Sequence, residues 1–317
     1  MALFLTEADV SRLIELPAIL TAVEEAFREK GEGRASNRPR HRASLGPVTL
    51  HCMNAALPAV GRLGFKAYTT GPAGARFYVM LFDETGALLA LMQADKLGQV
   101  RTGCASGVAA KYMANPDAET VGLIGTGWQA RTQVAAVCAV RPVREVRVYS
   151  RRPGNVAAFC REMSAELPGV RLVLAESARQ AVSGAAIVVT ITNAAEPVVF
   201  GEWLSPGTTV LAAGSNRAAA RELDAAAIRR CGLIAADSVE QARMESGDLI
   251  AAVQEGAITW DAVHELGDVV AGKVPGRLSR DEINLFKSNG LALEDVAAAH
   301  VVYEKARSLG VGVELDI

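Results

Sequence analysis

Residues 120–130 read TVGLIGTGWQA, a short apolar run that meets a glycine-rich turn. Gly125 suits a tight turn, Gly127 lets backbone N–H groups approach a phosphate, and the small Ala130 lets a following helix pack closely on the strand. A strand that ends in Gly-x-Gly-x-x-Ala and opens a helix is typical of a dinucleotide-binding βαβ unit. A glycine-rich turn without a ligand is the alternative. The candidate cradle consists of Gly125, Thr126, Gly127, Trp128, Gln129 and Ala130.

The alternation of strand and helix patterns continues after this stretch. The apolar segment VRVYS at 146–150 is followed by the helical pattern of NVAAFCREM at 155–163. Buried strands that alternate with amphipathic helices indicate a doubly wound parallel sheet. Further strand patterns are RLVLA (171–175), AAIVVTIT (185–192), TVLAAG (209–214) and GLIAAD (232–237).

The chain before this region has a different character. Thr6 with nearby acidic residues predicts a helix start, and apolar spacing predicts one helix over 7–29. Short segments between residues 48 and 93 predict a small antiparallel or mixed sheet that includes a hairpin at Asp83-Glu84-Thr85-Gly86. The basic segment RPRHRAS at 38–44 is read as a loop.

Two helices frame the predicted parallel sheet. Residues 101–114 have helical character and end before the turn Asn115-Pro116-Asp117, and residues 293–309 form a final helix. We expect that helix to return to the first part of the chain. The fold class is therefore α/β, with a Rossmann doubly wound parallel sheet inserted between two parts of a smaller α+β domain. The predicted domains are 1–115 with 291–317, and 116–290.

Composition excludes several classes of protein. The 317 residues are 50% hydrophobic and 21% charged with a net charge of −2, which suits a globular enzyme and gives no basic field for nucleic acid. Five widely spaced cysteines indicate a reducing compartment rather than disulfides or a metal site. The start MALFLTEADV is not typical of a signal peptide, and the sequence has no 18-residue apolar stretch. We expect a cytoplasmic protein without nucleic-acid or membrane partners.

The end of the second predicted strand bears on the choice of cofactor. A site that prefers NAD usually has Asp or Glu here, whereas this chain has Ser150, Arg151 and Arg152. A hydroxyl and two guanidinium groups favour the 2′-phosphate of NADP(H), with NAD(H) as the alternative if the arginines are solvated. Thr190 and Thr192 end a later strand and either line the cofactor or serve only as strand residues.

Residues 209–224, TVLAAGSNRAAARELD, place Asn216 just after a predicted buried strand. Polar residues at the carboxyl end of a strand often face a ligand crevice. From the residues alone, Asn216 acts in catalysis, caps a helix or occupies a turn.

Several motifs together resemble the ornithine cyclodeaminase/μ-crystallin family over nearly the whole chain. They are GRLGFKAYTT (61–70), QVRTGCASGVAAKYMA (99–114), GLIGTGWQA (122–130), GSN…RELD (214–224), ADSVEQARMESGDL (236–249) and LFKSNGLALEDVAAA (285–299). The resemblance implies a homodimer, a split substrate domain made of both chain ends, and a Rossmann domain between them. It also implies chemistry on an α-amino or α-imino acid with a nicotinamide.

The resemblance also implies roles for single residues. Lys66 and Arg101 look like the family residues that hold the substrate carboxylate, and either Arg40 or Arg42 matches a third cation. His51 and Met53 are further candidates for substrate contact. Thr102, Ser288 and Gly290 resemble family positions near the cofactor.

Asn216 stands where family cyclodeaminases and alanine dehydrogenases commonly carry Asp. An amide forms hydrogen bonds but does not exchange a proton as a carboxylate does, so cyclodeamination is disfavoured and imine reduction is favoured. We therefore predict an NAD(P)H-dependent reductase of a small α-imino acid such as iminosuccinate or pyrroline-2-carboxylate, reversible as an amino-acid dehydrogenase. An ornithine cyclodeaminase with bound NAD and a μ-crystallin-like ligand-binding protein are the alternatives.

Overall fold

The computed structural model describes residues 2–316, which form two compact units. Unit 1 comprises Met1–Arg101 with Gly290–Ile317, and unit 2 comprises Thr102–Asn289. The first crossing between them lies inside helix α3 (Asp95–Met113). The sequence places its domain boundary later, at the turn after this helix.

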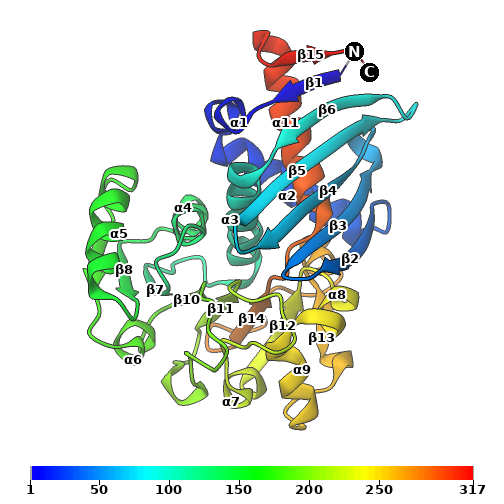
Figure 1. Ribbon diagram of the computed structural model, residues 1–317. Coiled ribbons are helices and arrows are strands. Elements are labelled where there is room, and N and C mark those ends of the chain that lie inside the picture. Colours follow the sequence, from blue (N-terminus) through cyan, green and yellow to red (C-terminus); the bar gives the residue numbers. More distant parts are fainter. Residues whose placement is uncertain (1, 317) are drawn as a thin grey trace. The chain divides into compact units, whose positions relative to one another are not determined.

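Unit 2 contains a parallel sheet covered by helices (Figure 1). Its strands are β7 (Thr120–Ile124), β8 (Glu145–Tyr149), β9 (Arg171–Leu174), β10 (Ile187–Thr190), β11 (Thr209–Ala212), β12 (Cys231–Ala236), β13 (Val263–Glu265) and β14 (Ile283–Lys287). The order is β13-β12-β14-β11-β10-β7-β8-β9, and every recorded pairing is parallel. The predicted doubly wound sheet is thus confirmed.

The strand order of unit 2 reverses direction at β7. The chain starts at β7 and builds outward on one side through β8 and β9 and on the other through β10 and β11. The crevice at the carboxyl ends of strands flanking such a reversal is the usual ligand site of open α/β sheets.

The helices of unit 2 are α4 (Ala130–Val140), α5 (Pro153–Glu166), α6 (Ala178–Val182), α7 (Ala225–Arg229), α8 (Val239–Glu245), α9 (Gly247–Gln254) and α10 (Leu266–Val270), with 3-10 turns η2 (Gly201–Trp203) and η3 (Trp260–Ala262).

Unit 1 contains a mixed sheet. Its strands are β1 (Ala2–Leu5), β2 (Ser36–Leu45), β3 (Val48–Leu57), β4 (Arg62–Gly71), β5 (Gly74–Asp83), β6 (Leu88–Gln93) and β15 (Val313–Leu315), with the 3-10 turn η1 (Pro58–Val60) before β4. The order is β15-β1-β6-β5-β4-β3-β2, in which β1 and β6 pair in parallel and the other neighbours are antiparallel. The predicted β5–β6 hairpin is confirmed.

The loop expected at 38–44 is wrong, because these residues belong to the edge strand β2. The register with β3 shifts between Arg38 and His41, so a β-bulge surrounds Pro39. Proline has no N–H to donate and is tolerated in a sheet at an edge or a bulge, and this strand has both features. The arginines around this proline give no alternation of apolar and polar residues, so periodicity alone does not predict a strand here.

The single helix predicted over 7–29 is also wrong. The chain forms α1 (Glu7–Leu13) and α2 (Leu16–Gly31), with Pro17 in the first turn of α2. Proline removes a helical N–H and clashes with the preceding turn, so the helix restarts at this point instead of continuing. The predicted start at Thr6 is confirmed, because its side chain accepts from Asp9 N in a capping box.

Helix α11 (Ala292–Leu309) packs with α2 on one face of the unit 1 sheet (Figure 1). Its close approach depends on Gly64 of β4, where a Cβ would lie 2.5 Å from Met80 O and 3.2 Å from Val296 Cγ2. The expectation that the last helix returns to the first part of the chain is confirmed. Over residues 2–316, no helix is both long and apolar enough to cross a membrane.

Candidate functional site

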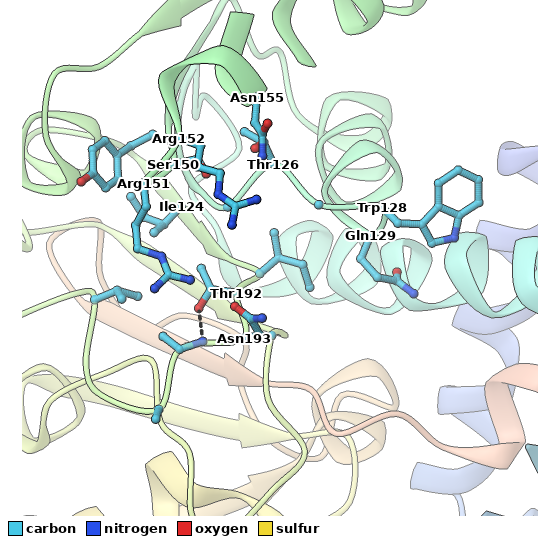
Figure 2. A pocket seen from close by; sticks show the side chains of 18 of the residues that line it. Ile124, Thr126, Trp128, Gln129, Ser150, Arg151, Arg152, Asn155, Thr192 and Asn193 are labelled. Atoms are coloured by element: carbon cyan, nitrogen blue, oxygen red, sulfur yellow. Dashed lines mark hydrogen bonds between the residues drawn. The ribbon is translucent and has the colours of Figure 1, made fainter. Parts of the chain in front are cut away.

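A cleft in unit 2 opens at the carboxyl ends of β7, β8 and β10 (Figure 2). Its walls are the turn after β7, the end of β8 and the loop after β10. Nine of the residues predicted to bind the cofactor line it, namely Gly125, Thr126, Gly127, Trp128, Gln129, Ser150, Arg151, Arg152 and Thr192. Asn155, Asn193 and Glu196 also line the cleft, and the sequence reasoning missed them.

The two glycines of the cradle have different physical requirements. Gly125 has φ +108°, and a Cβ there would lie 2.4 Å from Ile191 O, so the fold itself requires glycine. Gly127 has no such requirement, because a Cβ there would meet no atom within 4 Å. Since Gly127 lines the cleft, the added methyl group would occupy space next to the turn. A glycine at position 127 fits a ligand that approaches the backbone closely, as a pyrophosphate does.

The arginines after β8 extend toward the loop that carries Thr192 and Asn193 (Figure 2). Both Arg151 and Arg152 are exposed, so each is available to an anionic group in the cleft. Of the described residues that line the cleft, Glu196 is the one with a carboxylate, and it belongs to the loop after β10 rather than to the end of β8.

Five predicted cofactor residues are absent from the cleft lining, namely Thr102, Ala130, Thr190, Ser288 and Gly290. Thr190 is fully buried and its hydroxyl donates to Glu222 Oε2 at 3.0 Å. Ala130 is fully buried at the start of α4, where its small side chain suits close packing. Neither residue lines the cleft, and direct contact of either with a cofactor stays a prediction.

The remaining residues of this group have structural partners in their own units. The carbonyl of Thr102 accepts from Gln133 Nε2 at 3.2 Å. The Ser288 hydroxyl donates to Asp237 Oδ2 at 3.3 Å, and the same oxygen accepts from Asn289 N at 2.6 Å. Asp237 therefore fixes the loop that follows β14.

Unit 1 contains a cluster of buried charges between its sheet and α11. Lys66 Nζ on β4 lies 2.9 Å from Asp295 Oδ1, and Arg101 Nε lies 3.1 Å from the same oxygen. Arg101 Nη1 also donates to Glu294 Oε2 at 2.5 Å. All four side chains are at most 8% exposed. The two cations predicted to hold a carboxylate are thus together, in a buried setting where charge interactions are strong.

Arg40 joins this cluster and Arg42 does not. Arg40 is 4% exposed, and its Nη2 donates to Gly290 O at 3.2 Å. Gly290 has φ +82°, and a Cβ there would lie 2.9 Å from Arg101 Nη1, so glycine lets the chain pass against that guanidinium. Arg42 is exposed on β2. Of the two alternatives, the geometry favours Arg40 as the third cation.

Electrostatics distinguish Lys66 from an ordinary lysine. Burial lowers the pKa of Lys66 to about 8, and the positive charge of Arg101 acts in the same direction, while Asp295 opposes the shift. The ammonium group therefore titrates near neutral pH instead of far above it. A cation with this behaviour both attracts a carboxylate and exchanges a proton in a physiological range.

The other two substrate candidates lie on the same face of the sheet. Met53 is 1% exposed and stands opposite Lys66 in the register of β3 and β4. The His51 ring stacks on Tyr68 with centroids 4.2 Å apart, and its Nε2 lies 3.0 Å from Thr70 Oγ1. Both residues border the buried cations, and contact with a substrate stays a prediction.

Asn216 follows β11 in unit 2 and is half-buried. The next helix, α7, begins at Ala225 with Asp224 as its N-cap, so the capping alternative for Asn216 is wrong. Just before it, Gly214 lines the cleft and the carbonyl of Ser215 accepts from Lys287 Nζ at 2.9 Å. Asn216 thus directly follows a segment that Lys287 of the sheet holds in place.

The sequence reasoning also missed the acidic partners of the site. Glu294 and Asp295 stand side by side in LALEDVAAA, an otherwise apolar helical stretch, and that pattern is a signal for buried charges with partners. Glu222 and Asp248 of unit 2 are equally buried.

The parallel sheet, the glycine turn and the cleft define a dinucleotide-binding α/β protein. Its sequence matches the profile of the ornithine cyclodeaminase/mu-crystallin family over residues 1–310, and the chain belongs to this family.

Solved structures of relatives superpose over the whole chain. The Δ1-pyrroline-2-carboxylate reductase of Thermococcus litoralis, in complex with NADH and L-proline, is 38% identical with a TM-score of 0.94 and covers 99% of this chain and 100% of its own. An archaeal alanine dehydrogenase dimer with bound NAD is 34% identical with a TM-score of 0.93, over 100% and 99%. The iminosuccinate reductase of Paracoccus denitrificans, in complex with NAD+, is 30% identical with a TM-score of 0.93, over 100% and 99%.

Proposed function

We propose that this chain reduces the C=N bond of small α-imino acids with a nicotinamide dinucleotide and catalyses the reverse reaction as an amino-acid dehydrogenase. The observation that carries the proposal is the buried cluster of Arg40, Lys66 and Arg101 in unit 1, next to the carboxylates Glu294 and Asp295. Three cations beside two carboxylates suit an anionic carboxylate group as ligand. Unit 2 supplies the dinucleotide cleft.

The relatives support the reaction class. Pyrroline-2-carboxylate reductase, alanine dehydrogenase and iminosuccinate reductase all act at a bond between carbon and an amine or imine nitrogen. Their complexes with NAD or NADH support a nicotinamide as the cofactor of this chain. The substrate class is therefore a small α-imino acid, with pyrroline-2-carboxylate and iminosuccinate as candidates.

The residues of the chain have separate tasks in this reaction. The bound nicotinamide supplies the hydride for the C2 carbon of the imine. Lys66, Arg101 and Arg40 hold the carboxylate and so fix the position of that carbon. Asn216 orients the imine nitrogen or a water molecule through its amide, which forms hydrogen bonds without taking up a proton.

Stoichiometry separates this function from ornithine cyclodeamination. An imine reductase consumes one NAD(P)H for each imine, whereas a cyclodeaminase converts ornithine to proline and ammonia with no net change in the dinucleotide. Incubation with ornithine and NAD is expected to give no proline. Formation of proline from ornithine would establish the alternative.

The cofactor preference is proposed to be NADP(H). The support is the pair Arg151 and Arg152 in the cleft lining, which suits a 2′-phosphate. The double replacement Arg151→Ala/Arg152→Ala is expected to weaken NADPH binding about tenfold or more, since a hydrogen bond to a charged group contributes roughly 1.5–3 kcal/mol, and to leave NADH binding almost unchanged. Calorimetric titration with both dinucleotides measures this. Arg144→Ala, at a 76% exposed arginine before β8, is the control. An unaltered NADPH/NADH ratio in the double variant would contradict the preference.

The lowered pKa of Lys66, about 8, gives a prediction for pH dependence. The protonated form binds the carboxylate, so kcat/KM for the imino acid is expected to fall by about tenfold per pH unit above this value, whereas the Kd of the dinucleotide stays constant. In Lys66→Arg the fall is expected to move to higher pH, because arginine stays protonated. For folding the sign is opposite: between about 8 and the usual pKa of 10.5 the unfolded chain binds more protons, so Lys66 makes the free energy of unfolding rise with pH.

A homodimer is proposed through the sheet face of unit 1 opposite α11. The residues Phe65, Met80 and Leu91 stand in one cross-strand row of β4, β5 and β6 on this face, and all three are partly exposed. Leu63 (41% exposed) and Tyr78 (37% exposed) extend the apolar surface. The dimeric alanine dehydrogenase supports the proposal that this apolar surface serves self-association.

Met80→Asp is expected to convert this dimer to a monomer, because it places a charge in the middle of the apolar face. Light scattering after size exclusion measures the mass. Leu174→Asp, at a 48% exposed leucine of unit 2, is expected to leave the mass unchanged. A Met80→Asp protein with the mass of the parent would rule out this face.

A further inference from the structure

The carboxylate of Glu222 connects two loops that line the dinucleotide cleft. Its Oε1 accepts from Thr192 N at 2.7 Å and from Thr192 Oγ1 at 2.8 Å. Its Oε2 accepts from Gly214 N at 2.8 Å and from Thr190 Oγ1 at 3.0 Å. Thr192 lies in the loop after β10 (Figure 2) and Gly214 follows β11, and both line the cleft. Glu222 itself is fully buried and is not part of the lining.

The hydrogen-bond pattern requires two accepting oxygens at this position, which a carboxyl group supplies and an amide does not. Each oxygen of Glu222 faces one backbone N–H, that of Thr192 or that of Gly214, and a backbone N–H only donates. A glutamine would satisfy one N–H with its carbonyl and would turn its own NH2 toward the other. Gly214 shows how close the contact is, because a Cβ there would lie 2.4 Å from Glu222 Oε1 and 2.3 Å from Thr192 N.

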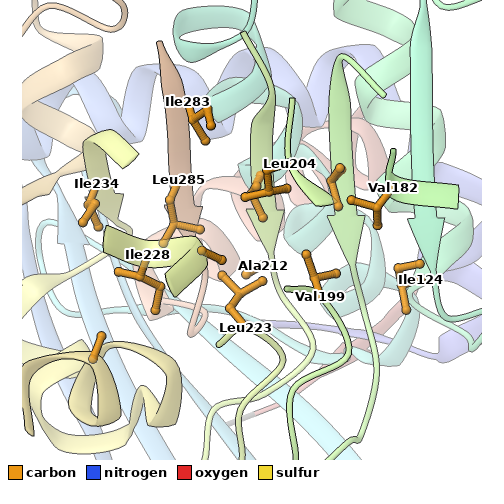
Figure 3. Packing of buried hydrophobic residues seen from close by; sticks show 14 of the residues in the cluster. Ile124, Val182, Val199, Leu204, Ala212, Leu223, Ile228, Ile234, Ile283 and Leu285 are labelled. Carbon is orange, nitrogen blue, oxygen red and sulfur yellow. The ribbon is translucent and has the colours of Figure 1, made fainter. Parts of the chain in front are cut away.

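Asp248 holds the backbone around Glu222 in place. Its N–H donates to Asp248 Oδ1 at 2.6 Å, and the N–H of Leu223 donates to the same oxygen at 2.9 Å. Leu223 and Val199 pack in the hydrophobic core of unit 2 and form a β-bridge with each other (Figure 3). Asp248 and the hydrophobic core of unit 2 therefore fix the backbone at Glu222, and the Glu222 side chain in turn binds the two loops through hydrogen bonds.

A buried ammonium completes the arrangement. Lys287 Nζ at the end of β14 lies 2.8 Å from Asp248 Oδ2 and donates to Ser215 O at 2.9 Å. Burial alone would lower the pKa of Lys287, yet Asp248 and Glu222 together raise it, so the lysine stays charged. The segment of Gly214 and Ser215 is thus held by Glu222 on one side and by Lys287 on the other.

We propose that Glu222 is a positioning residue that fixes the loops after β10 and β11 in the shape that binds the dinucleotide. This rests on the proposed nucleotide-dependent function. Loss of the connection frees both loops, and the dinucleotide must then order them again on binding. The expected signature is a loss of affinity for the nicotinamide dinucleotide with no loss of binding sites.

Glu222→Gln tests the proposal in the full-length protein by calorimetric titration with NADPH and NADH and by thermal unfolding. The Kd is expected to rise about tenfold or more, because one hydrogen bond is lost and two donors face each other. A partly unfolded variant would instead show fewer sites at unchanged Kd. Thr190→Val removes one donor from Glu222, keeps the β-branched shape, and is expected to raise the Kd by about threefold.

Asp224→Ala is the matched control two residues away. Asp224 Oδ1 accepts from Gly201 N at 2.9 Å and from Ala227 N at 2.8 Å, and none of these three residues lines the cleft. Its loss is expected to lower the unfolding temperature without changing the Kd. A Kd of Glu222→Gln equal to that of the parent overturns the proposal, and if that variant does not fold, an unchanged Kd in Thr190→Val overturns it. A parent that binds neither dinucleotide would instead refute the proposed function.

Discussion

Lys66→Ala is expected to lower kcat/KM for the imino acid by roughly 10²- to 10³-fold, because it removes one of three cations from a buried carboxylate site. The Kd of the dinucleotide is expected to stay within about twofold of the parent, since Lys66 belongs to unit 1 and the cleft is built by unit 2 alone. Steady-state kinetics and calorimetric titration measure the two quantities on one preparation.

Lys305→Ala is the control for this variant. Lys305 lies on α11, as the acidic partners of Lys66 do, but its side chain is 31% exposed and pairs with Glu15 at 2.5 Å. Exposed ion pairs contribute little, so turnover and stability are expected to stay near those of the parent. Normal turnover in Lys66→Ala would remove Lys66 from the site and leave the buried cluster with a structural role.

Gly127→Ala is expected to weaken dinucleotide binding strongly while the protein keeps its unfolding temperature. The added Cβ meets no protein atom within 4 Å, so the fold has room for it. The same methyl group enters the space next to the turn that the pyrophosphate needs, and a loss of affinity on the order of 100-fold or more is expected. Titration with NADPH and differential scanning calorimetry measure the two effects.

Gly154→Ala is the matched control, because a Cβ at this position of α5 also meets no atom within 4 Å, and Gly154 is not part of the cleft lining. Both quantities are expected to stay near those of the parent. Gly125→Ala provides a contrast, since its positive φ and the contact with Ile191 O predict a loss of stability as well. Normal NADPH affinity in Gly127→Ala would contradict a phosphate cradle at this turn.

The sequence predicted unit 2 better than unit 1, and the reason is physical. Parallel strands such as β7 and β10 are buried on both faces, so they read as short apolar runs between helices, and the glycine turn indicates a dinucleotide-binding βαβ unit. Strand β14 was missed because Asn284 and Lys287 interrupt the apolar residues of this short buried segment. Periodicity does not reveal a buried lysine whose partner, Asp248, is far away in the sequence.

In unit 1 the missed features depend on contacts between distant residues. The short strands β1 and β15 pair with each other from opposite ends of the chain, and no local pattern marks them. The choice between Arg40 and Arg42 stayed open because residues two apart on a strand point to the same side, and it is the contact of Arg40 with the distant Gly290 that separates them. The structure settles the burial of each residue, and binding of a carboxylate by Arg40 follows as a proposal.

The acidic residues show the same limit. Glu222, Glu294 and Asp295 are each fully buried, and each owes its position to donors that are far away in the sequence or on another element. Sequence reasoning identified the cations because a resemblance marks them, and it passed over the carboxylates that hold them. A charged pair in an apolar helix is the signal that would have identified Glu294 and Asp295.

The proposed function depends on reduction of an α-imino acid with a nicotinamide dinucleotide. The most direct measurement follows oxidation of NADPH and NADH with pyrroline-2-carboxylate, and with oxaloacetate, pyruvate or glyoxylate in the presence of ammonia or methylamine. We expect oxidation that requires both the imine and Lys66, with formation of the corresponding amino acid in equal amount. No oxidation with any of these imines, by a protein that binds the dinucleotide, would contradict the claim.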